Sequence, residues 1–236
     1  MTFFKLSTSL ISIVYKRSLL DQCYVCDIRR EGTLCSSCQK LLQRNHSHCQ
    51  LCSRPTAVTV TLCGECQQTL PSFDRIIAPL RYEGLCRGLI RKAKFENQPH
   101  LLRPLVTFII DHLIEHDIAL PTAWCVVPTS QQSLSERGYC QTTLIADLLS
   151  KAPTLASMQR IVLKRRLEVS AQHTRSKAER HSLSHRLFYT EERVPEQVLL
   201  IDDVVTTGST AEACAKALRL AGAKRVTVLA LARTSE

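Results

Sequence analysis

Short apolar runs alternate with longer amphipathic stretches from residue 73 to the end of the chain. The apolar runs predict buried strands at about residues 73–80, 124–128, 161–163, 198–201 and 226–232. Between them, apolar residues recur at helical spacing over about 85–94, 101–116, 142–149 and 211–221. Strands that alternate with helices are typical of right-handed βαβ units, so the pattern predicts an α/β fold with a parallel sheet.

The first 70 residues lack this alternation and hold most of the cysteines. Each C-x-x-C pair can direct two thiolates at one ion, and two pairs complete a tetrahedral zinc site. We expect two structural Zn²⁺ ions, with the first pair joined to the second and the third to the fourth. A cross-braced pairing is the alternative arrangement, and an iron–sulfur cluster is the alternative cofactor. The eight predicted ligands are Cys23, Cys26, Cys35, Cys38, Cys49, Cys52, Cys63 and Cys66.

This contrast in composition predicts two domains behind a lead-in helix over residues 1–19. A double zinc ribbon is expected over 20–70 and the α/β domain over 71–236. The apolar tract at 6–15 is interrupted by Lys16 and Arg17, and no small-residue cleavage site follows it, so we expect neither a signal peptide nor a membrane span. We therefore expect a cytoplasmic location. In the cytoplasm, C-x-x-C pairs bind metal more often than they form disulfides.

The chain is basic, with a formal net charge of +10. Two zinc ions on eight thiolates would reduce this to about +6, which still favours an anionic partner. The positive charge is concentrated between residues 160 and 186, where eight Lys or Arg side chains accompany two acids. This segment has no clear periodicity, and a long loop of this kind inside a domain is usually functional.

The most informative stretch is 198–210, with the sequence V-L-L-I-D-D-V-V-T-T-G-S-T. It predicts a buried strand that delivers Asp202 and Asp203 to the carboxyl edge of the sheet, where open α/β sheets bind ligands. The small residues that follow offer backbone N–H groups and hydroxyls just before a helix, which is an anion site. The chemistry suggested is a phosphorylated sugar, with its hydroxyls on the carboxylates and its phosphate in the loop. A metal ion could join them.

A second loop, 129–137, follows the strand at 124–128 and is also expected at the carboxyl edge. Arg137 is its only cation, and we predict that it contacts an anion; a solvated turn arginine is the simpler alternative.

In these motifs the chain resembles the ComF/GntX family, whose members combine a double zinc ribbon with a type I phosphoribosyltransferase domain. The resemblance rests on the paired cysteines, on Tyr82 with L-I-R-K-A-K-F at 89–95, on V-P at 127–128 with R-G-Y-C-Q at 137–141, and on the signature stretch with A-R-T at 232–234. It implies binding of phosphoribosyl pyrophosphate (PRPP) with Mg²⁺, and pentosyl transfer if the protein is an enzyme. The predicted PRPP contacts are Asp202, Asp203, Val204, Thr206, Thr207, Gly208, Ser209, Thr210, Lys94 and Arg180.

In the reaction that the resemblance implies, Asp202, Asp203 and Arg137 are the catalytic candidates. The aspartates would hold the ribose hydroxyls, Arg137 or Lys94 the pyrophosphate, and residues 164–180 would close as a lid. The chain departs from the family at Ser130 and Ser133, at Cys140 in place of asparagine, and at Val169 and Leu183. These departures affect the pyrophosphate and acceptor sides of the expected site, so turnover is less secure than PRPP binding.

The alternative function is a non-catalytic factor that handles nucleic acid, with the zinc ribbons and the basic segment on single-stranded DNA. The resemblance implies partners among competence DNA-uptake proteins or a role in gluconate use. The sequence supports DNA binding only through charge, because aromatic residues are 5% of the chain and none is interleaved with the basic residues of the segment to stack on bases. Both functions could coexist, with PRPP changing the DNA contacts.

Overall fold

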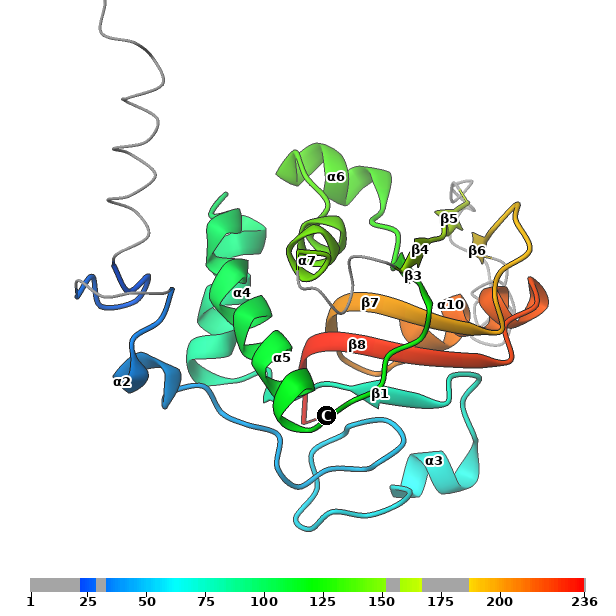
Figure 1. Cartoon of the computed structure of the whole chain (residues 1–236), viewed down its shortest axis with the longest axis horizontal. Helices are drawn as coiled ribbons and strands as arrows, with labels where there is room; N and C mark the ends of the chain where they lie inside the picture. Colours follow the sequence, from blue (N-terminus) through cyan, green and yellow to red (C-terminus); the bar gives the residue numbers. More distant parts are fainter. Residues whose placement is uncertain (1–21, 29–32, 152–157, 167–186, 236) are drawn as a thin grey trace, which may run out of the picture. The chain divides into compact units, whose positions relative to one another are not determined.

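The structure is a computed structural model that describes residues 22–28, 33–151, 158–166 and 187–235 (Figure 1). The predicted lead-in helix at 1–19 lies outside these residues, as do Arg180 and most of the basic segment. Contacts divide the chain into two compact units, Met1–Leu42 and Gln43–Glu236. A double zinc ribbon was expected over 20–70, and the division between the units falls inside that range.

The larger unit is built on a parallel sheet with strand order β1-β8-β7-β3-β4, and β2 also pairs with β8. Every pairing within this sheet is parallel, while β5 and β6 form a separate antiparallel pair. The α/β prediction is therefore confirmed. The strands are β1 (Arg75–Ile77), β2 (Leu80–Arg81), β3 (Ala123–Val126), β4 (Gln159–Arg160), β5 (Lys164–Arg165), β6 (Phe188–Tyr189), β7 (Gln197–Val205) and β8 (Arg225–Arg233).

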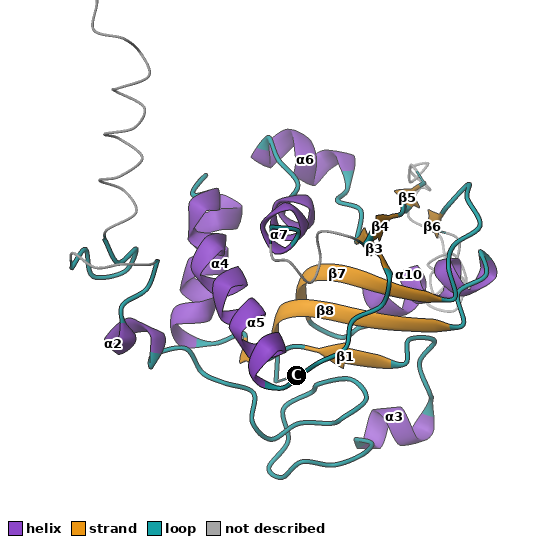
Figure 2. Ribbon diagram, viewed as in Figure 1, coloured by secondary structure: helices purple, strands orange, loops and turns teal. Residues whose placement is uncertain are grey.

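Helices pack on both faces of the sheet (Figure 2). Val198 and Leu200 of β7 share an apolar cluster with Cys214 and Leu218 of α10. Residues between them on the strand, such as Leu199, are equally buried and point to the opposite face because strand side chains alternate. The described helices are α2 (Ser36–Gln39), α3 (Gly64–Gln68), α4 (Gly84–Phe95), η1 (Pro99–Leu102), α5 (Arg103–Glu115), α6 (Gln131–Arg137), α7 (Gln141–Leu149) and α10 (Ser209–Leu220).

Three predicted elements differ from the structure in type or continuity. The strand expected at 73–80 is divided into β1 and β2 around Pro79, which has no N–H to donate to a ladder. The apolar run at 161–163 lies between β4 and β5 and outside both strands. The loop expected at 129–137 contains helix α6, because the Ser130 hydroxyl caps it by accepting from the Ser133 N–H at 3.1 Å.

No helix among the described residues is both long and apolar enough to cross a lipid bilayer.

Candidate functional site

Strand β7 carries both predicted carboxylates, at residues 202 and 203, close to its carboxyl end at Val205. The strand is longer than the apolar run 198–201 because β8 extends beside it, with Asp202 opposite Ala230 and Val205 opposite Arg233. The aspartates are thus held inside the ladder and do not lie in the following loop. Each carboxylate also accepts the N–H of the next residue, at 2.8 Å for Asp202 and 2.6 Å for Asp203.

The two carboxylates lie in different surroundings because neighbouring strand residues point to opposite faces. Asp203 forms an ion pair with Lys94 of α4, with 2.7 Å between Oδ2 and Nζ. Asp202 lies on the α10 side, where its charge adds to the effect of burial in raising the pKa of Cys214. Burial raises the pKa of Asp202 itself to about 7, and the neighbouring charge of Asp203 acts in the same direction. Near neutral pH, Asp202 can therefore accept or donate a hydrogen bond.

The loop after β7 and the start of α10 could hold an anion. Gly208 lies in the left-handed region at φ 84° and precedes the helix without a side-chain cap, and glycine takes this conformation without strain. The N-terminal N–H groups of a helix attract anions. Thr206, Thr207, Ser209 and Thr210 are exposed around them, and the Thr207 hydroxyl donates to the Ser209 hydroxyl at 2.9 Å. The helix begins at Ser209, two residues earlier than predicted.

The R-G-Y turn at 137–139 packs against the last turn of α4. The Tyr139 hydroxyl donates to the carbonyl oxygen of Ala93, and the Arg137 guanidinium lies 5.5 Å from the centre of the Phe95 ring. Arg137 also donates to the Gln141 side-chain oxygen at 3.1 Å. Lys94, in the same turn of α4, forms the ion pair with Asp203. The end of α4 therefore contacts both the R-G-Y turn and the strand that carries the aspartates. Cys140 replaces the asparagine that the family resemblance predicts. Its sulfur forms hydrogen bonds with the hydroxyls of Thr129 and Thr142.

The cysteines form two groups whose sulfur atoms lie within 4.8 Å of one another. The first is Cys23, Cys26, Cys35 and Cys38, and the second is Cys49, Cys52, Cys63 and Cys66. Sequential pairing of the C-x-x-C motifs is confirmed, and the cross-braced alternative is wrong. Backbone N–H groups point at the sulfurs, from Cys38 to Cys35 at 3.3 Å and from Cys63 to Cys49 at 3.2 Å. Four thiolates gathered in this way fit a structural Zn²⁺ ion.

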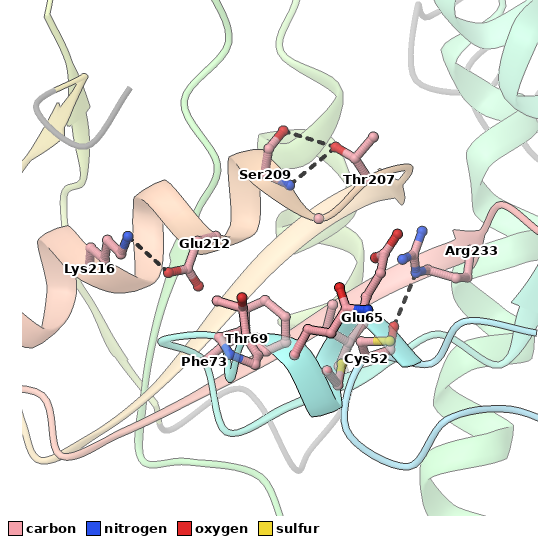
Figure 3. Close-up of a pocket in the computed structure, with 14 residues that line it drawn as sticks. Cys52, Glu65, Thr69, Phe73, Thr207, Ser209, Glu212, Lys216 and Arg233 are labelled. Carbon is pink, nitrogen blue, oxygen red and sulfur yellow. Dashed lines mark hydrogen bonds and ion pairs between the residues drawn. The ribbon is translucent and has the colours of Figure 1, made fainter. Parts of the chain in front are cut away.

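A cavity of about 440 Å³ lies between the second cysteine cluster and the loop at residues 206–210, here called the signature loop (Figure 3). Its lining includes Cys52 and Cys66 of the cluster, Thr207 and Ser209 of the loop, and Arg233. Sequence reasoning had placed the cysteines and the loop in separate domains, and it gave Arg233 no role. The available signal for Arg233 was its position: a charged residue directly follows the apolar run V-T-V-L-A-L-A at 226–232.

Comparison with known proteins is consistent with this arrangement, although no family model matches the chain. The chain is 30% identical over 207 residues to competence protein F of Haemophilus influenzae, covering 85% of this chain and 90% of the relative. It is 28% identical to the DNA utilization protein YhgH of Escherichia coli K12, with the same coverage. Competence protein ComFC of Streptococcus pneumoniae is 24% identical, over 86% of this chain and 89% of the relative. The chain belongs to the ComF family.

Proposed function

We propose that the chain binds PRPP with Mg²⁺ at the carboxyl edge of its sheet, as a phosphoribosyltransferase-like protein that serves DNA uptake. The observation that carries the proposal is the continuity of β7, the Gly208 turn and α10. These elements bring two carboxylates at the end of a strand and the N-terminus of a helix together within a few residues of chain. The DNA-uptake role rests on relatives named competence protein F and DNA utilization protein.

In this proposal the loop at 206–210 binds the 5-phosphate through N–H groups and hydroxyls, and Asp202 and Asp203 hold the ribose hydroxyls. Lys94 keeps the Asp203 carboxylate in place until the sugar arrives, and then lies near the pyrophosphate with Arg137. Mg²⁺, when bound with the ligand, would neutralise charge on the departing pyrophosphate. The chain's own contribution to pentosyl transfer is then positioning and electrostatic stabilisation.

Calorimetric titration with PRPP and Mg²⁺ tests the binding site. We expect binding to the parent protein and its loss in the Asp202→Asn/Asp203→Asn double variant. Asp147→Asn, an exposed carboxylate on α7, is the matched control and should bind as the parent does. A parent protein that does not bind PRPP, or a double variant that binds unchanged, would contradict the proposal. Turnover is then tested with candidate acceptors.

The second candidate function is contact with single-stranded DNA, and three arginine–aromatic stacks favour it. Arg160 lies 5.4 Å from the centre of the Trp124 ring, Arg165 5.8 Å from Phe188, and Arg166 5.0 Å from Tyr189. The sequence showed no aromatic residues interleaved with this basic segment, but the fold supplies them from β3 and β6. Guanidinium groups positioned over aromatic rings are suited to contact phosphates and bases.

Fluorescence anisotropy with a labelled single-stranded oligonucleotide tests this function. We expect Arg160→Ala/Arg166→Ala to weaken binding and to reduce its salt dependence. Arg225→Ala, at the exposed start of β8, should leave both unchanged. If PRPP regulates the DNA contacts, saturating PRPP will shift the affinity; an affinity that does not respond to PRPP refutes that coupling.

A further inference from the structure

Arg233 is the last residue of β8 and lies opposite Val205, the last residue of β7. Its Nε donates to the carbonyl oxygen of Cys52 at 3.0 Å, and its Nη1 donates to the carbonyl oxygen of Val205 at 3.1 Å. One guanidinium therefore bridges the second cysteine cluster and the residue that precedes the signature loop. Figure 3 shows its bond to Cys52. A planar fork of donors suits this task, and a lysine could not make both bonds in the same geometry.

Both ends of this bridge are held by other bonds. On the cluster side, the Leu51 carbonyl accepts from the Ile76 N–H at 2.8 Å, and the Ser53 hydroxyl donates to the Ile76 carbonyl at 2.6 Å. The turn that carries Cys52 is thus fixed to β1. On the loop side, the Val205 carbonyl also accepts from the Thr234 N–H at 3.1 Å. Displacing Cys52 would pull on Arg233, and through it on the backbone where the loop begins.

Charge gives the bridge a second role. Arg233 is 1% exposed, and among the ion pairs formed by the described residues none includes it. A buried cation is costly unless a negative group compensates it. Four thiolates around Zn²⁺ carry a net charge of −2, so a metal in the second cluster would supply that compensation.

We propose that Arg233 couples metal occupancy of the second cysteine cluster to the conformation of the signature loop, and so to ligand binding at residues 206–210. Arg233 acts as a positioning residue, because it touches the cluster backbone and the strand end and not the expected ligand. The ligand part of this inference rests on the proposed PRPP site. Coupling of this kind is reciprocal: if zinc favours the ligand-binding form of the loop, the ligand must in turn favour zinc.

The first experiment measures zinc transfer to a chromogenic chelator from the full chain in a Cys35→Ser background, where only the second cluster is complete. Changes to groups that support metal ligands cost about 10- to 100-fold in metal affinity, and we expect Arg233→Met to speed zinc release by a factor in this range. Arg233→Lys, which keeps the charge but not the fork, should be intermediate. Arg225→Met is the matched control, and its release rate should equal that of the parent.

The second experiment follows amide hydrogen exchange in peptides that cover 202–209. Exchange there should accelerate about tenfold or more in Arg233→Met, and also in the unsubstituted chain when the chelator removes zinc from the second cluster. The unsubstituted chain keeps the test valid if the variant does not fold. Peptides that cover α7 are the internal reference: exchange that accelerates equally there reports unfolding of the whole unit and counts against coupling.

The third experiment adds PRPP and Mg²⁺ to the zinc-transfer assay. PRPP should slow zinc release in the chain with Arg233 and have no effect in Arg233→Met. If the chain does not bind PRPP, this arm fails together with the proposed function, while zinc release and exchange without ligand still decide whether the cluster and loop are coupled. Unchanged release and unchanged exchange in Arg233→Met would overturn the inference.

Discussion

The two cysteine clusters have the same ligands and the same motif type but different structural roles. In the first, the described apolar surroundings are the buried cysteines and the partly buried Leu34. The second belongs to an apolar cluster that includes β7, β8 and α10. Equal ligand sets therefore lie in different surroundings: among the residues that the structure describes, the first cluster packs with few apolar side chains, and the second is part of the core of the α/β unit. Sequence motifs identify a metal site but do not reveal what it supports.

The largest expected effect separates the clusters by substituting one equivalent cysteine in each. Cys35 and Cys63 both precede a short helix, α2 and α3. Because a structural zinc site contributes on the order of 10 kcal/mol to folding, Cys63→Ser should abolish the cooperative unfolding of the larger unit or lower its stability by more than about 5 kcal/mol. Cys35→Ser should change the stability of the larger unit by less than about 1 kcal/mol.

Trp124 provides the measurement for this comparison. It is the single tryptophan of the chain, is buried in β3 of the larger unit, and reports unfolding of that unit alone. Fluorescence-monitored denaturation of the two variants, at equal zinc, gives the difference. Equal losses in both variants would contradict the division of roles between the clusters.

The next effect concerns pH, and it also distinguishes the units. Asp27, a described carboxylate of the smaller unit, is exposed, whereas Asp202 of the larger unit is buried with its pKa raised to about 7. The folded state binds the Asp202 proton more tightly than the unfolded chain does. The free energy of unfolding therefore falls as the pH rises toward 7, and above pH 7 the full cost of the buried carboxylate applies. Between pH 5.5 and 8.5 the cost amounts to about 2 kcal/mol.

Asp202→Asn should remove this dependence and make the larger unit more stable than the parent at pH 8.5. Urea denaturation of parent and variant across that pH range, with zinc present, measures the difference. Asp27→Asn is the control and should follow the parent curve. Parallel curves for Asp202→Asn and the parent would show that the carboxyl is not perturbed as described.

The smallest effect tests how the second cluster is attached to the sheet. The Ser53 side chain is buried and donates to the Ile76 carbonyl at 2.6 Å, so Ser53→Ala removes one buried hydrogen bond. We expect a loss of about 1–2 kcal/mol in the stability of the larger unit, measured again through Trp124. Ser37→Ala, at an exposed position of α2 in the smaller unit, should have no measurable effect there. A neutral Ser53→Ala would mean that the contact does not hold the cluster in place.

Much of this architecture could be predicted from the sequence because the signals are local. The apolar run before Asp202 and Asp203, the glycine at 208 and the amphipathic stretch that follows are short-range features, and they yield a strand, turn and helix in the correct order. The C-x-x-C spacing likewise predicted both cysteine clusters and the sequential pairing of the motifs. The errors in β1, β7 and α6 arose where a neighbouring strand or a capping hydroxyl extends or breaks an element, since periodicity alone does not register either effect.

The fold class, the two cysteine clusters and the position of the signature loop could be predicted from the sequence, because each depends on residues close together in the chain. The partners that these residues meet are known only from the tertiary structure. Lys94 reaches Asp203 and Arg233 reaches Cys52 across more than 100 residues of chain, and the second cluster joins the core of the larger unit. Contacts of this kind depend on the register of packed elements, which periodicity and spacing do not encode.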